Sequence, residues 1–396
     1  MSERAGAIAP TKLFNRQYVF FTLVNLLVSV SFSMVSTTMS RYAHNLGMAV
    51  ATAGAITGAF SIASMVIRPF SGYVNDRFDR KGLLVLSTGA MALCTFGYGF
   101  FSSYGGLLTL RLLHGAAFAF SSTVNMAVIP GIVPEKRVGE AVSYFGVVQS
   151  VAMAAGPSIG LGLAQIGGFR LNFSASALLA LVGALMAVFL CRFGEQGEKR
   201  TAHRRPRLSD IIAKECLVYT LVDIAIASAS GLENSMIALY GEQLGMGNIG
   251  WYFTISAVTL CVTRILFGRI ADRRGTAFAL YPGLLLMVVG FLLLFRPAGA
   301  WMFAAAAVIK TLGVALARPA IQAACLKAVP PERRGSAAST FYIGSDIGQG
   351  TSPAIGGKIV DMTGGTDYGL AFAWYALPLA LAGGLYAIWE KRKRAK

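Results

Sequence analysis

The stretch GYVNDRFDRKG at positions 72–82 has a partner later in the chain, GRIADRRG at positions 268–275. Gly72 and Gly268 lie 196 residues apart, and the same spacing aligns charged residues and prolines around them. Aligned at that spacing are Arg68, Gly72, Asp76 and Arg77 with Arg264, Gly268, Asp272 and Arg273, Pro134 and Arg137 with Pro330 and Arg333, and Pro157 and Gly160 with Pro353 and Gly356. Apolar residues match by chance easily, but Arg, Asp and Pro at one register indicate that the chain is a duplication.

The composition indicates that lipid surrounds most of the chain. Of 396 residues, 55% are hydrophobic and only 13% are charged, and the mean hydropathy is +0.61. A soluble domain carries about 25% charged residues, so this chain could not cover a water-exposed surface. A membrane-spanning helix needs roughly 20 apolar residues. Apolar stretches of that length predict twelve such helices, at 17–39, 50–73, 83–101, 106–129, 139–163, 173–193, 216–240, 250–270, 276–296, 301–325, 337–360 and 369–390.

These stretches fall into two sets of six separated by the polar segment 193–215. The sequence therefore predicts an all-α membrane protein with an N-terminal six-helix bundle (1–192), a cytoplasmic linker (193–215) and a C-terminal six-helix bundle (216–396). Parallel repeats of this kind are related by a pseudo-two-fold axis, place the substrate near mid-membrane between them, and work by rocking one repeat against the other.

The net charge of +17 follows the topology of the chain. Lys and Arg collect at both ends and in alternate loops, which the positive-inside rule assigns to the cytoplasmic side. We therefore expect a multi-pass protein of the cell (inner or plasma) membrane, monomeric, with both termini in the cytoplasm. No basic stripe with interleaved aromatic residues appears, so a nucleic-acid partner is not expected.

Nothing in the sequence predicts an enzyme, a metal site or a cofactor. The five cysteines are scattered without a CxxC pattern, and such spacing indicates neither zinc nor a disulfide framework. No GxxxxGK[ST] loop occurs, which disfavours an ATP-driven pump.

The two loop motifs give the chain a family resemblance over essentially its whole length. Segments 72–82 and 268–275 resemble the G-x-x-x-D-R-x-G-R-[KR] loop of the major facilitator superfamily, with Asp79 where that family usually has Gly. The resemblance implies a conformational latch that stabilises the outward-facing state, and the open alternative is a set of topological loop charges. The latch residues by this resemblance are Gly72, Asp76, Arg77, Arg80, Gly268, Asp272 and Arg273.

Two further stretches resemble the twelve-helix drug:proton antiporters of that superfamily. LRLLHGAAFA (110–119) matches the motif in which Arg111 precedes Gly115 by four residues, with His114 in place of the usual Gln. AAGPSIGLGL (154–163) contains the G-P-x-x-G pattern at Gly156, Pro157 and Gly160. The resemblance implies proton-coupled export and gives Arg111 a role in coupling. The alternative is that the Arg111 side chain extends to the outer membrane–water interface and has no role in transport.

Charged residues inside apolar stretches are functional candidates, because a buried charge in a membrane is costly and a proton can neutralise an acid. Glu233 and Asp346 are such acids, and His114 could titrate near neutral pH. The alternative for the acids is a structural ion pair, for which Lys310 is one partner. Asp223 lies nearer the cytoplasmic end and is expected to be solvated. Candidates for substrate binding are Asn25, Asn125, Glu233, Tyr240 and Lys310.

The sequence thus favours a secondary active transporter that exports a small amphipathic molecule or drug by alternating access, driven by protons. A proton-coupled importer, symporter or facilitator of a small metabolite is the alternative and would share every fold-level feature. A non-transporting membrane sensor is a more distant alternative, because it predicts either no alternating-access motifs or a large appended domain, and neither expectation fits this sequence.

Overall fold

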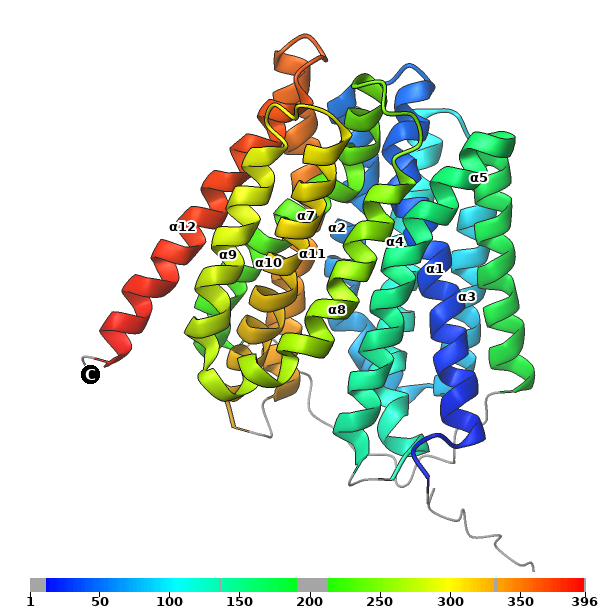
Figure 1. The fold of residues 1–396 in the computed structure, drawn as a ribbon. Coiled ribbons are helices and arrows are strands. Elements are labelled where there is room, and N and C mark those ends of the chain that lie inside the picture. The colour runs from blue at the N-terminus through cyan, green and yellow to red at the C-terminus, as the bar shows by residue number, and fades with distance from the viewer. Residues whose placement is uncertain (1–11, 135–136, 191–212, 331–333, 395–396) are drawn as a thin grey trace, which may run out of the picture.

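The computed structural model describes residues 12–134, 137–190, 213–330 and 334–394. Those residues form long α-helices and, throughout these ranges, no β-strand. The helices, labelled in Figure 1, are α1 (Arg16–Asn45), α2 (Val50–Arg77), α3 (Arg80–Gly97), α4 (Tyr104–Ile132), α5 (Val138–Phe189), α7 (Leu217–Gln243), α8 (Gly250–Arg274), α9 (Thr276–Leu293), α10 (Ala300–Lys327), α11 (Arg334–Met362) and α12 (Tyr368–Arg394), with a short 3-10 helix, η2, at Lys214–Cys216.

Helix α5 consists of two arms that fold back on each other. Its regular geometry breaks at Gly167 (φ −133°, ψ 20°) and Gly168 (φ 74°, ψ 177°). Glycine reaches the positive φ at Gly168 without the steric cost that a Cβ would bring. The two arms meet at the top of Figure 1 and correspond to the separate stretches predicted at 139–163 and 173–193.

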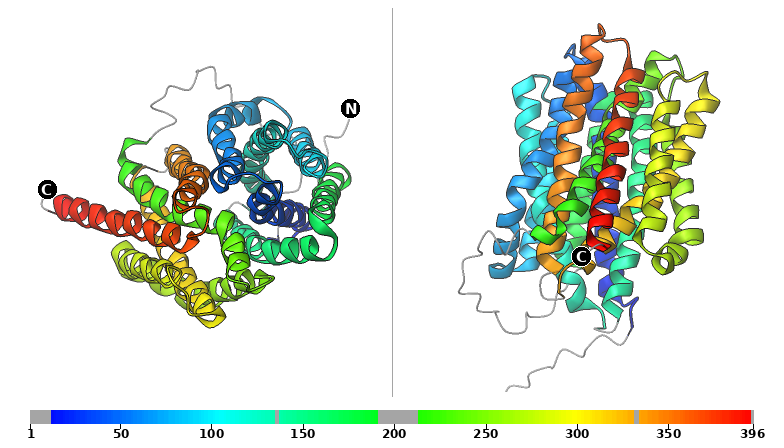
Figure 2. Two further views of the ribbon diagram at one scale, coloured as in Figure 1. Left: turned by 90° about the horizontal axis from the view of Figure 1, so that it is seen from above. Right: turned by 90° about the vertical axis from the view of Figure 1, so that its left-hand side faces the viewer.

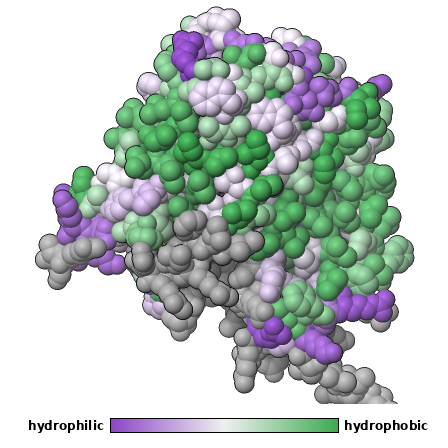
Figure 3. Space-filling view, viewed as in Figure 1, coloured by the Kyte–Doolittle hydropathy of each residue, from purple (hydrophilic) through white to green (hydrophobic). Residues whose placement is uncertain are grey.

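Eight segments of the described chain are long and apolar enough to cross a membrane, with both arms of α5 counted as one. The all-helical membrane fold is therefore confirmed, whereas the count of twelve spans stays a prediction. Figure 3 shows the corresponding surface, in which a broad apolar belt separates hydrophilic ends. Many leucines, such as Leu86 and Leu93, are exposed.

Buried side chains gather separately in the two parts of the chain. One large cluster extends from Ala213 to Tyr386 and takes in only Val50 and Leu161 from the first part. Two clusters within residues 13–187 form the core of the first part. Viewed from above, helices α1–α5 and α7–α12 form two neighbouring groups (Figure 2). The predicted linker lies largely outside the described residues, since only its end, at 213–215, is described.

The two groups meet along α2 and α11, which pack closely through glycines. A Cβ added to Gly54 or Gly58 would collide with the backbone of Pro353 or Gly350 on α11. Small residues let membrane helices approach to backbone contact. Antiparallel contact along this pair therefore forms one seam between the first and second parts of the chain.

Polar bonds join the two parts at the end where α1 finishes and α2 begins. Asp361 of α11 accepts hydrogen bonds from the backbone N–H groups of Val50 (3.2 Å) and Ala51 (2.9 Å), at the N-terminus of α2. Arg41 of α1 forms an ion pair with Glu242 of α7 at 2.8 Å. The molecule is therefore closed at the end opposite its termini.

Candidate functional site

An ion pair between Arg68 of α2 and Asp346 of α11 joins the two parts of the chain at depth. Arg68 Nε donates to Asp346 Oδ2 at 2.5 Å, and its Nη2 lies 3.3 Å from Oδ1. The arginine side chain is 16% exposed and the aspartate side chain 9%. Ser122 and the ring of Tyr342 also contact the guanidinium. Arg68 entered the sequence analysis only as part of the repeat, so its role as the partner of Asp346 was missed.

A second ion pair lies beside the first, between Asp223 of α7 and Arg318 of α10. Arg318 Nε is 3.4 Å from Asp223 Oδ1. Ser345 of α11 accepts a hydrogen bond from Arg318 Nη2 (3.1 Å) and donates one to Asp223 Oδ2. Asp223 has no exposed surface. The expectation that it is solvated was therefore wrong, because α10 and α11 enclose the first turns of α7.

Glu233 of α7 pairs with Lys310 of α10 inside the second group of helices. The lysine ammonium donates to Glu233 Oε1 and lies 5.6 Å from the centre of the Tyr252 ring. Both side chains are buried. Lys310 is the partner that the sequence offered for a structural ion pair, and this contact lies within one group of helices rather than between the two.

Arg111 and His114 of α4 lie in an aromatic pocket of the first group. Arg111 is fully buried, and none of its guanidinium nitrogens makes a hydrogen bond to the described residues. Its charge faces the rings of Phe60 (5.6 Å) and Tyr98 (5.8 Å). His114 Nδ1 is 3.1 Å from the Tyr98 hydroxyl. The structure thus places this cation inside the bundle, stabilised by π-electrons rather than by a carboxylate.

The glycines of the two antiporter-like motifs lie at helix crossings. A Cβ on Gly115 would meet the Phe60 carbonyl oxygen on α2. Gly156 and Gly160 of α5 face Ser33 and Met34 of α1 at distances that leave no room for a side chain. Pro157 lies between them inside α5. These positions allow close packing of α2 with α4 and of α1 with α5.

The latch motifs lie at the ends of α2 and α8 nearest the termini. The surroundings of Gly72, Asp76, Arg77, Gly268, Asp272 and Arg273 are outside the described part of the structure. Arg80 is described, and its Nη1 donates to the Ala127 carbonyl of α4 at 2.9 Å. Asp79, the departure from the family pattern, caps α3 by accepting a hydrogen bond from the Gly82 N–H (2.6 Å).

The remaining substrate candidates fall into two places. Asn125 of α4 donates to Asn25 of α1 at 3.2 Å, and both are buried in the first group. Tyr240 lies far from them, among the rings of Phe303, Tyr368 and Phe372 near the closed end. The structure therefore does not bring the five predicted substrate residues together.

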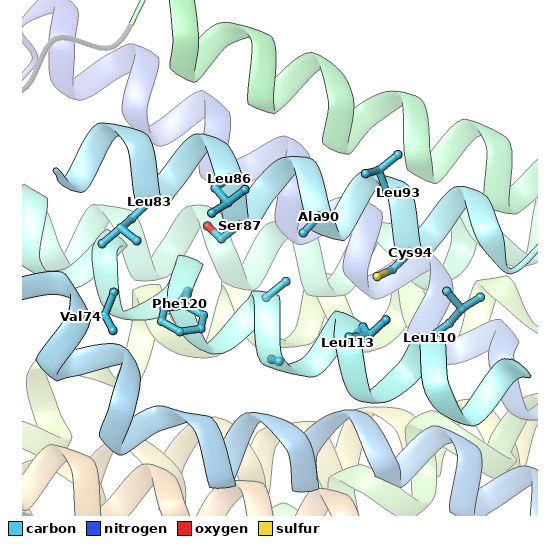
Figure 4. Close-up of a pocket in the computed structure, with 12 residues that line it drawn as sticks. Val74, Leu83, Leu86, Ser87, Ala90, Leu93, Cys94, Leu110, Leu113 and Phe120 are labelled. Carbon is cyan, nitrogen blue, oxygen red and sulfur yellow. The ribbon is translucent and has the colours of Figure 1, made fainter. Parts of the chain in front are cut away.

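An apolar groove of about 590 Å³ runs between α3 and α4 (Figure 4). Leu86, Leu93 and Leu113 line it and are exposed by 72%, 74% and 55%. No predicted site residue lines this groove, and its walls belong to the apolar outer surface. Among the described residues, no group of His, Cys, Asp or Glu is arranged to hold a metal ion.

The family model of the Major Facilitator Superfamily matches the chain in two stretches, residues 21–248 and 221–396. The staphylopine export protein of Staphylococcus aureus is 25% identical over 345 residues, covering 81% of this chain and 83% of that protein. Multidrug resistance protein 2 of Bacillus subtilis is 24% identical over 400 residues, covering 96% and 98%.

The fold is also similar to that of solved transporters. The crystal structure of the nucleoside transporter NupG superposes with a TM-score of 0.74 at 15% identity, covering 95% of this chain and 99% of that one. That likeness concerns the fold alone, whereas the family model covers nearly the whole sequence. The two groups of helices, the repeated motifs and these matches together show that the chain belongs to the major facilitator superfamily.

Proposed function

We propose that this chain is a proton-coupled exporter of a small amphipathic molecule, working by alternating access in the inner membrane. In this proposal it is a monomer with twelve spans and both termini in the cytoplasm, the arms of α5 being two of the spans. The bundles are 1–192 and 216–396, joined by the linker 193–215. The 196-residue repeat and the separate buried cores support this division.

The observation that carries the proposal is the ion pair between Arg68 and Asp346. Its partners belong to different bundles, so opening of the α2–α11 seam at this depth must separate them. Breaking a buried pair while leaving one charge buried costs about 3–5 kcal/mol. A proton can remove that cost by neutralising a carboxylate, and proton binding is thereby linked to the opening of one side.

The opposite side is held by a different set of contacts. Asp361 at the N-terminus of α2 and the Arg41–Glu242 pair both join the bundles at the closed end. Opening toward that end must break these bonds instead of the Arg68–Asp346 pair. Because the two openings break different contacts, a proton that weakens one set changes the balance between the two access states.

The other candidates receive roles that follow from their surroundings. Arg111 and His114 form a buried polar group in the first bundle that couples protonation to helix packing. In the second bundle Glu233 is held by Lys310, and we assign Glu233 a part in proton coupling through this pair. The loop motifs act as the latch at the cytoplasmic end.

For substrate contacts, we assign Asn25 and Asn125 to the first bundle, and Glu233, Lys310 and Tyr240 to the second. The names of two relatives, a staphylopine export protein and a multidrug resistance protein, support the outward direction. An importer or facilitator is the outcome that the transport experiment must distinguish.

The proposal is tested in proteoliposomes with an imposed pH gradient and a panel of labelled amphipathic cations, anions and zwitterions, beginning with ethidium. We expect accumulation against the substrate gradient that disappears when an ionophore collapses the pH gradient. Asp346→Asn should lower gradient-driven flux by at least about tenfold, since it leaves the Arg68 charge without its carboxylate at a cost of about 3–5 kcal/mol. Asp367→Asn is the matched control, because Asp367 pairs with Arg296 within one bundle and near the surface.

Accumulation that persists without the pH gradient would contradict proton coupling. Flux that follows the proton inward in right-side-out vesicles would show an importer instead. If Asp346→Asn and Asp367→Asn behaved alike, the Arg68–Asp346 pair would not be the coupling element.

A further inference from the structure

Two buried acids and two partly exposed arginines form one group across the seam between the bundles. The acids are Asp223 and Asp346, and the arginines are Arg68 and Arg318. Taken together their formal charges cancel. Three of the four belong to the second bundle, which on its own holds two negative charges and one positive charge.

The two ion pairs are physically connected through neighbouring residues of α11. Asp346 binds Arg68, while the preceding Ser345 accepts a hydrogen bond from Arg318 and donates one to Asp223. Arg318 is also close enough to interact electrostatically with Asp346, and Asp346 with Asp223. A change in the charge of Asp346 therefore alters the electrostatic environment of Asp223 through one side chain, that of Arg318.

Withdrawal of Arg68 with the first bundle leaves the second bundle with one uncompensated negative charge. An isolated ionised carboxylate is so costly in an apolar environment that it binds a proton instead. One proton restores neutrality. The charge count thus requires one proton for each withdrawal of Arg68, whichever acid receives it.

We infer that Asp223 is the acid that binds this proton, and that Arg318 is a positioning residue that moves from Asp223 to Asp346 when Arg68 leaves. The side chain of Arg318 is 31% exposed, whereas Asp223 is completely enclosed. Asp223 Oδ1 lies 3.4 Å from Arg318 Nε, and Oδ2 accepts the bond from Ser345, so Oδ1 is the oxygen that can carry the proton once Arg318 has moved away. Asp346 faces the space that Arg68 vacates, and Arg318 then replaces Arg68 as its cationic partner.

The step is balanced in charge and atoms. The Asp223 carboxylate gains one proton from water and becomes a neutral acid, and the Arg318 guanidinium changes partners without losing a proton. Ser345 can keep its bond to Asp223 Oδ2 throughout, because a protonated carboxyl group still accepts hydrogen bonds.

Few other titratable groups border Asp223 on the helices packed against α7. The thiol of Cys325 on α10 is within electrostatic reach of Asp223. Cys216 of η2 and Tyr219 of α7 lie next to that thiol, and Tyr386 of α12 contacts Tyr219. On α1 the charged side chain that reaches α7 is Arg41, which binds Glu242 at the other end of the helix. Among these groups, the charged neighbours of Asp223 are Arg318 and Asp346.

The inference rests on the proposed function only in naming this exchange a coupling step, and its test needs no substrate. The carbonyl band of protonated carboxyl groups is measured by infrared spectroscopy on the full chain in nanodiscs at neutral pH. Arg68→Gln imitates the withdrawn arginine. We expect it to add one protonated carboxyl group per chain relative to the unsubstituted protein.

Glutamate substitutions identify the acid, because the carbonyl band of Glu differs in frequency from that of Asp. The band should move in Arg68→Gln/Asp223→Glu and stay in place in Arg68→Gln/Asp346→Glu. Arg41→Gln is the matched control: it also removes an arginine that links the bundles, but its partner Glu242 is 47% exposed to solvent, so no new band is expected. If Arg68→Gln fails to fold, by size-exclusion chromatography and circular dichroism, Arg68→Met replaces it.

Absence of a new band in a folded Arg68 variant would overturn the charge count. A band that moves only with Asp346→Glu would overturn the assignment to Asp223. If the band behaves as expected while no pH gradient drives transport, the proposed function fails and this proton site stands.

Discussion

Asp361 offers a direct test of how the bundles are held together at the closed end. Its carboxylate lies on α11 and accepts hydrogen bonds from Val50 and Ala51 at the N-terminus of α2. A side-chain cap is worth about 0.5–2 kcal/mol, and a negative charge at a helix N-terminus adds about 0.3–1 kcal/mol. The two bonds use different carboxylate oxygens, so Asp361→Asn keeps one acceptor, loses the other bond and removes the charge. We therefore expect a loss of about 1–2 kcal/mol. That corresponds to a population shift of about 5–30-fold toward states open at this end.

The assay is hydrogen–deuterium exchange of the full chain in nanodiscs, read in peptides that cover the beginning of α2 and the end of α11. Exchange there should become about 5–30-fold faster in Asp361→Asn and faster still in Asp361→Ala, while the middle of α4 is unchanged. Asp367→Asn, which removes an acid of the same end that bonds within its own bundle, should exchange like the unsubstituted protein. Equal exchange in all variants would refute the view that this carboxylate holds the end closed.

Three further outcomes follow from the packing. Gly58→Leu should abolish stable folding, measured as loss of the monodisperse peak in size-exclusion chromatography, because its Cβ would strike the Gly350 backbone; a monodisperse variant would contradict the close approach of α2 and α11. Glu233→Gln should lower the free energy of unfolding by about 3–5 kcal/mol, because it leaves the charge of Lys310 without a partner. The double variant Glu233→Gln/Lys310→Met should recover most of that loss, since it also removes the charge. Additive losses in the two single variants would argue against the ion pair. Arg111→Met should preserve or raise the melting temperature yet stop proton-driven flux, and unchanged flux would make Arg111 purely structural.

Much of the fold was readable from local patterns. The break at Gly167 and Gly168 separates two stretches that the sequence had already placed apart, and α2 and α9 begin at the predicted Val50 and Thr276. The start of α3 was placed three residues late. Its first turn, Arg80–Gly82, is polar, so hydropathy did not reveal it, whereas the Asp79 cap stabilises it.

The candidate site residues were only partly predictable from the sequence. Asp346 and Glu233 stood out as acids in apolar stretches, and Lys310 was offered as a partner for either acid. The structure pairs it with Glu233. Arg68 was visible as a repeated residue near the end of an apolar run, but its partner lies 278 positions away. Asp223 was wrongly expected to be solvated, because its burial depends on the packing of α10 and α11 around α7. The sequence of α7 alone does not reveal that packing.

The sequence by itself determined the helices, the duplication and the superfamily, because hydropathy and motif spacing act within one segment or one repeat. Only the tertiary structure decided which charges meet. Ion pairs across the seam depend on how two bundles face each other, and that arrangement is set by close contacts such as Gly58 with Gly350 rather than by any local pattern. The loop motif at 72–82 thus identified the family, while the helix that leads into it, through Arg68, supplied the link between the bundles.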